Sequence, residues 1–137
     1  MIICSGKSVL KGVAIGKIYL YKKQEYVLEK KQVEDTEAEI ARFELAKETA
    51  TQQLDSLYHK ALEEAGEEQA MIFDVHKMML DDGDYLDSIR SMIRDEKVNA
   101  EYAVSITGDN FSAVFAFMDD EYMKARSVDV LDISNRV

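Results

Sequence analysis

The sequence predicts a mainly α-helical fold, an antiparallel helical bundle built on a long helical hairpin and preceded by a short β segment. Three observations lead to this prediction. Proline is absent from the 137 residues and glycine occurs only six times, so few residues interrupt helices. After residue 33, apolar residues recur at steps of three, four and seven, which is typical of helices. Before residue 22, β-branched and aromatic residues dominate instead, which favours strand.

The first two elements follow from these patterns. Residues 2–21 are expected as strand, above all Val13 to Tyr21. Residues 33–65 are expected as one long helix, close to 50 Å at about 1.5 Å per residue, so it must pair with later helices as a hairpin. Gly66 is the natural break. The residues that share one face of this helix are Ile40, Phe43, Ala50, Leu54, Leu57 and Ala61.

Four helices follow. One is expected over residues 67–82, with Gly83 as its end. The next covers residues 84–96, where Tyr85, Leu86, Ile89, Met92 and Ile93 share one side. Asn99 is a typical capping residue for a fourth helix, in which Gly108 is a weak point. A fifth begins near Asp119 or Asp120.

Composition excludes several classes of protein. The net charge is −10, which argues against nucleic-acid binding and favours a basic partner. No apolar run is long enough to span a membrane and no signal peptide is present, so we expect a cytoplasmic protein. Cys4 has no second cysteine for a disulfide, and we interpret it as a small buried residue rather than a reactive thiol.

The helix over residues 67–82 has more apolar surface than a core requires. At 100° per residue, five residues cover about 120° of its surface, and Phe73 and Leu80 lie on another face. Either the helix is buried on both sides, or one face is a docking surface. Abundant methionine and marginal carboxylates favour docking, because thioethers adapt to partners and acids attract a basic one. The five residues are Met71, Ile72, Val75, Met78 and Met79.

No catalytic or metal site is predicted. The carboxylates lie on helix exteriors beside solvent rather than around a pocket. Phe73 and Ser56 stand three residues before His76 and His59, where a di-iron bundle needs glutamate. His76 is therefore expected to be packed or at an interface. Gly12 and Gly16 have the wrong spacing for a phosphate-binding loop.

Three stretches of the sequence resemble enzyme I of the phosphoenolpyruvate:sugar phosphotransferase system. They are Gly12 to Lys17 (GVAIGK), Gly66 to Asp82 (GEExxxIFxxHxMxLxD) and Asp119 to Ile133 (DDEYxxxRxxDVxDI). The resemblance implies that residues 1–26 are a strand segment of an incomplete phosphohistidine domain. It also implies that residues 33–137 form the helical domain that binds the histidine phosphocarrier protein HPr.

By position, the resemblance assigns partner-binding roles to residues on several helices. These are Glu67, Glu68, Met71, Asp74, Val75, Met78, Met79, Asp82, Asp84, Tyr85, Phe111, Phe115, Tyr122, Met123 and Arg126. Arg126 is a cation in an acidic neighbourhood, and an intrahelical pair with Glu121 or Asp129 would give it a purely structural role.

The resemblance also implies what this chain does not contain. The phosphate-accepting histidine and the barrel that binds phosphoenolpyruvate and magnesium would lie beyond Val137, so the chain alone is expected to be inactive and to need no cofactor. The full-length parent is expected to use magnesium and to dimerise through its carboxy-terminal domain. Val13 to Tyr21 is expected to be an unsatisfied edge that pairs with Ile2 to Cys4 or with another molecule.

Two other functions stay open from the sequence. One is a structural helical adaptor or coiled-coil module without a link to phosphate transfer. The other is the equivalent domain of a nitrogen-regulatory paralogue, which would keep the docking surface but change the partner.

Overall fold

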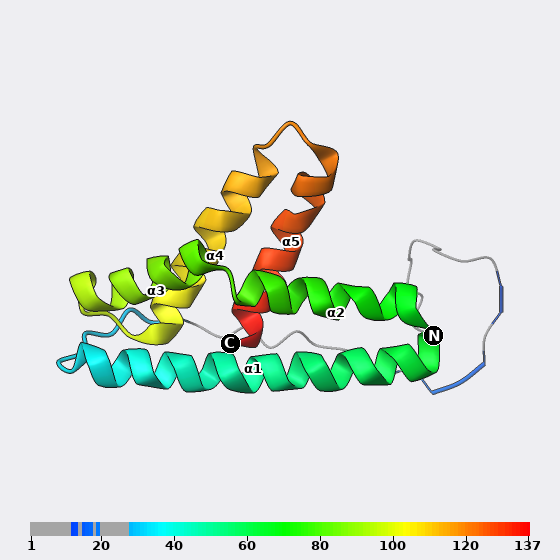
Figure 1. Ribbon diagram of the computed structural model, residues 1–137, viewed down its shortest axis with the longest axis horizontal. Helices are drawn as coiled ribbons and strands as arrows, with labels where there is room; N and C mark the ends of the chain where they lie inside the picture. Colours follow the sequence, from blue (N-terminus) through cyan, green and yellow to red (C-terminus); the bar gives the residue numbers. More distant parts are fainter. Residues whose placement is uncertain (1–11, 14, 18, 20–27) are drawn as a thin grey trace, which may run out of the picture.

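The computed structural model describes residues 12, 13, 15–17, 19 and 28–137. Five helices follow one another: α1 (Thr36–Ala65), α2 (Glu67–Leu80), α3 (Gly83–Glu96), α4 (Ala100–Ala116) and α5 (Glu121–Arg136). Figure 1 shows α2 and α3 lying one after the other along α1, while α4 and α5 form a hairpin that rises from the region where α2 meets α3. The mainly helical fold is confirmed.

Both ends of α1 have a local cause. The Asp35 side chain accepts a hydrogen bond from the Ala38 amide at 2.9 Å, which caps the helix. The helix begins later than the expected residue 33, because the Val33 amide donates to the Lys97 carbonyl at 2.9 Å. Gly66 has φ of 93°, a conformation that glycine adopts without strain. It interrupts the helical conformation between α1 and α2, as predicted.

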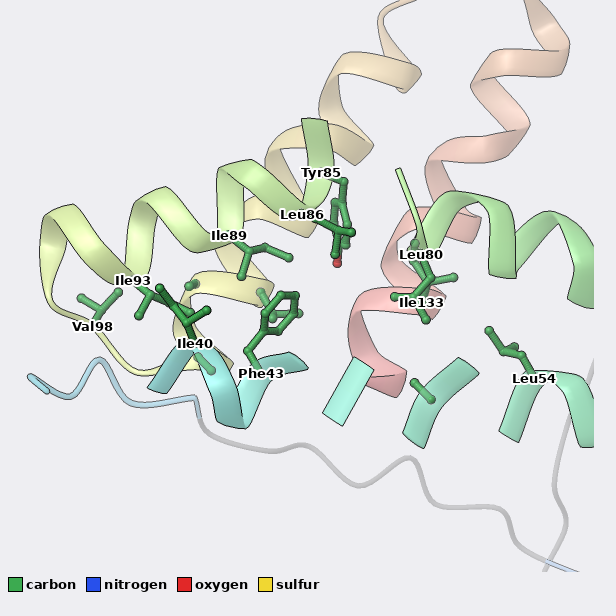
Figure 2. Close-up of a cluster of buried hydrophobic side chains, with 14 residues drawn as sticks. Ile40, Phe43, Leu54, Leu80, Tyr85, Leu86, Ile89, Ile93, Val98 and Ile133 are labelled. Atoms are coloured by element: carbon green, nitrogen blue, oxygen red, sulfur yellow. The ribbon is translucent and has the colours of Figure 1, made fainter. Parts of the chain in front are cut away.

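The core joins α1 to α2, α3 and α5. Figure 2 shows Ile40 and Phe43 of α1 beside Ile89 and Ile93 of α3, and it shows Leu54 farther along α1 near Leu80 and Ile133. Phe43, Leu54, Leu80, Ile89, Ile93 and Ile133 are all fully buried. One 30-residue helix is therefore covered by two shorter helices in succession, as its apolar face requires.

Gly83 does not end α2, contrary to expectation. The helix ends at Leu80, and Asp82 is the N-cap of α3. The Asp82 carboxylate accepts a hydrogen bond from the Tyr85 amide at 2.9 Å, so the chain enters the next helix at once. Gly83 is therefore the first residue of α3 rather than the residue that ends α2.

A short clasp connects the segment before α1 with the turn between α3 and α4. Asn99 lies at the N-cap of α4 as expected, but its side chain accepts from the Lys31 amide at 2.8 Å rather than from its own helix. Gln32 and Val98 form an antiparallel bridge. The first amide of α4, on Ala100, donates instead to the Glu39 carboxylate of α1 at 2.7 Å.

The expected β segment is not seen in the described part of the chain. Residues 12, 13, 15–17 and 19 are outside any strand, and the rest of 1–26, with the proposed pairing of Ile2 to Cys4, lies outside the described residues. Within the described residues, no helix combines the length and the low polarity that crossing a membrane requires.

Gly108 is a contact point rather than the expected weak point of α4. It is buried inside the helix, where α4 faces Ser134 of α5. A Cβ added at position 108 would overlap the Ser134 hydroxyl and lie 2.8 Å from the Ser134 Cβ. The absence of a side chain therefore allows α4 and α5 to pack this closely.

We predict that Gly108→Ala lowers the free energy of unfolding by about 1–3 kcal/mol, because overpacking outweighs the higher helix propensity of alanine. Urea unfolding followed by circular dichroism measures the change. Gly83→Ala is the matched control, since nothing lies within 4 Å of its added Cβ, and it should leave stability unchanged or raise it by up to about 1 kcal/mol. Equal effects at both positions would contradict the close-packing explanation.

Arg42 joins α1 to the start of α4 through two carboxylates. Its guanidinium donates to Glu101 at 2.7 and 2.9 Å and to Glu39 at 2.6 and 3.1 Å. Hydrogen bonding from Arg42 lowers the pKa of Glu101 from 4.5 to about 2 and also lowers the pKa of Glu39. Because the Glu101 side chain is about half exposed, solvent screens much of this interaction.

We predict that Glu101→Gln destabilises the fold above pH 4.5 and that this difference disappears as the pH falls through about 2. The sign follows from the pKa of Glu101, which is lower in the folded chain, so its stabilisation is present when both states are ionised and is lost on protonation. Urea unfolding at pH 7, 4.5, 3 and 2 tests this. Glu34→Gln, at an exposed acid without an ion pair among the described residues, should show no such trend.

Candidate partner-binding groove

A groove with a volume of about 560 Å³ opens where α2, α3, α4 and α5 meet. Its walls combine apolar and aromatic side chains with two acids and one arginine. The lining residues are Val75, Met78, Met79, Asp82, Asp84, Tyr85, Phe111, Phe115, Tyr122, Met123, Arg126, Val130 and Ile133. Such a surface suits a partner with an apolar patch.

The two apolar faces of α2 have different surroundings in the structure. Leu80 is fully buried and Phe73 packs against the core, so this face holds α2 in the bundle. Met71 and Met78 on the other face are 55 % and 75 % exposed. The helix is therefore not buried on both sides, and the surplus apolar face is open to solvent.

The floor of the groove is aromatic and rigidly held. Tyr85 is 2 % exposed, and its ring packs edge-on against Phe111 with centroids 5.6 Å apart. The Tyr85 hydroxyl is hydrogen-bonded to the Ser134 hydroxyl at 2.8 Å, and burial raises the pKa of Tyr85. The Tyr85 hydroxyl is therefore already paired within the bundle, and the ring is held in place.

The α5 wall carries an arginine fixed by its neighbours. Arg126 donates to Asp129 at 2.8 Å and to the Tyr122 hydroxyl at 2.6 Å, and its guanidinium carbon lies 4.5 Å from the Tyr122 ring centroid. The hydrogen bond to Asp129 raises the pKa of Arg126. Of the two intrahelical partners considered for Arg126, the structure shows Asp129.

The acids near the groove fall into two groups. Asp74 pairs with Lys77 at 2.9 Å and Asp81 pairs with Lys47 at 2.5 Å, so their charge is largely compensated. Asp82 and Asp84 at the groove margin are exposed and form no ion pair within the described part of the chain. These two carboxylates give the groove an acidic edge that favours a basic partner.

Most of the residues implicated by the resemblance come together here, although they are far apart in sequence. Four of them lie outside the groove lining: Glu67, Glu68, Met71 and Asp74. Glu67 and Glu68 occupy the first turn of α2, at the end next to α1. Val130 and Ile133 line the groove but were missed, although their spacing of four and seven residues from Arg126 places them on its face of α5.

His76 is packed inside the bundle, as expected, being 9 % exposed. Its Nε2 atom lies 3.4 Å from the Asp129 carboxylate of α5 and has no hydrogen bond in the described part of the structure. The two atoms are in contact, but the contact does not meet the geometric requirements of a hydrogen bond.

Comparisons with known proteins agree on one family. Residues 5–126 match the model described as "PEP-utilising enzyme, N-terminal". Phosphoenolpyruvate-protein phosphotransferases of Bacillus sp. (strain S) and of Geobacillus stearothermophilus are each 42 % identical to this chain over 132 residues, which is 96 % of the chain and 23 % of each relative. The chain therefore spans less than a quarter of these relatives.

Solved structures give the same result. An NMR solution structure of Enzyme I (nEIt) is 35 % identical, with a TM-score of 0.79 over 88 % of this chain and 50 % of that one. The N-terminal domain of Enzyme 1 - Nitrogen is 25 % identical, with a TM-score of 0.72 over 79 % of this chain and 45 % of that one. The chain belongs to the family of PEP-utilising enzymes and corresponds to their N-terminal region.

Proposed function

We propose that this chain is the HPr-docking part of a phosphoenolpyruvate-protein phosphotransferase, the enzyme I that passes phosphate from phosphoenolpyruvate through a histidine to HPr during sugar uptake. One observation carries the proposal: the groove combines exposed Met78 and Tyr122 with the unpaired edge carboxylates of Asp82 and Asp84. A small basic protein with an apolar patch fits this surface.

Phosphate transfer itself is assigned to the longer parent protein. The sequence contains two histidines, His59 and His76, and neither stands in the Gly-Gly-x-Thr-Ser-His stretch that accepts phosphate in enzyme I. His76 is buried and His59 is exposed on α1, beside Tyr58. The chain alone is therefore proposed to bind HPr without transferring phosphate.

Several properties of the parent belong to the same proposal. Residues 1–26 would form a strand segment of a phosphohistidine domain, and residues 33–137 the HPr-binding domain. Magnesium would be held by the phosphoenolpyruvate-binding barrel of the parent, as the resemblance to enzyme I implies. The parent would be cytoplasmic and would dimerise through its carboxy-terminal domain.

The nitrogen-regulatory paralogue is the second candidate, favoured by the similarity to the N-terminal domain of Enzyme 1 - Nitrogen. The higher identities to the phosphoenolpyruvate-protein phosphotransferases and to Enzyme I (nEIt) support the first candidate. Titration with HPr and, in parallel, with the phosphocarrier of the nitrogen-regulatory system separates the two candidates, because the correct partner should bind more tightly. An adaptor unrelated to phosphate transfer is disfavoured by a family match over residues 5–126.

We predict that Met78→Asp and Tyr122→Asp each weaken HPr binding at least tenfold, because each places a charge in the apolar centre of the interface (roughly 2 kcal/mol or more for a central residue). Titration of isotope-labelled HPr with the chain, followed by NMR, measures the affinity. Leu45→Asp is the control, at an apolar residue of α1 that is 69 % exposed and outside the groove. Unchanged spectra with both groove variants would remove the basis of the docking assignment.

We further predict that binding weakens as salt rises from about 50 to 500 mM, because ions screen the attraction between the acidic edge and a basic partner. Asp84→Asn should reduce this salt dependence, whereas Glu34→Gln, outside the groove, should not. Affinity that stays constant with salt would argue against a role of the acidic edge.

A further inference from the structure

Asp129 of α5 contacts two groups that belong to different parts of the molecule. Its Oδ2 accepts a hydrogen bond from Arg126 Nη1 at 2.8 Å. Its Oδ1 lies 3.4 Å from Nε2 of His76 on α2. The side chains of Asp129 and Arg126 are each 18 % exposed and that of His76 is 11 % exposed, so the chain of contacts lies mostly beneath the surface.

The contacts continue outward to the exposed surface of the groove. Arg126 Nη2 donates to the Tyr122 hydroxyl at 2.6 Å, and Tyr122 is 63 % exposed. A single chain of polar contacts therefore runs from a buried histidine of α2, through a carboxylate and a guanidinium of α5, to an exposed tyrosine.

This series of polar contacts links the α2 wall of the groove to the α5 wall. His76 lies between Val75 and Met78 in α2, the wall that carries the exposed methionine, while Tyr122 and Arg126 belong to the α5 wall. The His76 Nε2 atom is buried and lacks a hydrogen bond among the described residues. The 3.4 Å contact between this atom and Asp129 Oδ1 joins α2 to α5 at this point, although it is not a hydrogen bond.

The same carboxylate limits the freedom of Arg126. A flexible arginine on a surface loses side-chain entropy when a partner fixes it. Asp129 and Tyr122 already hold the guanidinium in the unbound chain, which reduces this loss on binding. The Arg126 guanidinium is thus held in position by its own helix before a partner binds.

We infer that Asp129 and His76 are positioning residues, which hold Arg126 and Tyr122 in the arrangement that receives the partner. The inference rests on the proposed function of the groove and deepens it, since neither residue lines the groove itself. Asp129 acts directly on Arg126, and His76 acts through Asp129.

A double-mutant cycle on HPr binding tests the inference. Asp129→Asn and Arg126→Ala should each weaken binding roughly fivefold to tenfold, and the double variant should be little weaker than Arg126→Ala alone, because both changes remove the same function. His76→Phe, which keeps the ring but removes its nitrogens, should weaken binding less than Asp129→Asn. Asp132→Asn is the control on the same helix and should bind like wild type. Additive losses would overturn the inference.

A second measurement on the free chain separates this inference from the proposed function. The side-chain ¹⁵N signals of Arg126 should show restricted guanidinium rotation in wild type and in Asp132→Asn, and averaged signals in Asp129→Asn. Free rotation of the Arg126 guanidinium in wild type would overturn the inference. This result needs no variant, so the test remains valid even if Asp129→Asn fails to fold. If wild type did not bind HPr while these signals behaved as expected, the proposed partner would be wrong and the positioning of Arg126 would stand.

Discussion

The fold depends on the need to cover one long helix. Helix α1 is 30 residues long, about 45 Å at the rise of an α-helix, and neither α2 nor α3, with 14 residues each, is long enough to cover it alone. The two helices therefore follow each other along it, and the turn at Asp81 and Asp82 falls over its middle. The hairpin of α4 and α5 packs at this junction (Figure 1), and the groove opens there because four helices converge without filling the space between them.

Periodicity and capping residues were sufficient to predict the helices. The buried face of α1 follows from its periodicity, and the break at Gly66 and the start of α5 at Asp120 depend on interactions within a few residues. The position of Asn99 was also predicted, although its side chain accepts from the Lys31 amide rather than from its own helix. The packing role of Gly108 depends on Ser134 of another helix. Such an approach between two helices leaves no mark in the local sequence. Gly83 is a local error instead: glycine commonly follows the end of a helix, but here Asp82 caps a new one.

The groove was partly predictable, because the periodicity of one helix shows which of its faces is apolar. Met71 and Met78 could be placed on an apolar face of α2 that was too large for a core, and their exposure in the structure agrees with that interpretation. The contribution of α5 could be assigned only through the resemblance to enzyme I, because residues on different helices have no common periodicity. His76 was expected to be packed or at an interface, and Asp129 was a candidate partner of Arg126. The contact between His76 and Asp129 was not predicted, because it joins two different helices. Spacing alone describes each helix separately.

The close approach of α4 to α5 at Gly108 has a consequence for how this region of the molecule tolerates change. Ser134 also accepts or donates the hydrogen bond to the Tyr85 hydroxyl at the floor of the groove, so positions 85, 108 and 134 share one small volume. A bulkier residue at position 108 requires a smaller one at 134, which removes the hydroxyl beside Tyr85. Substitutions at these three sites are therefore coupled, and a variant that appears harmless in one sequence background would be harmful in another.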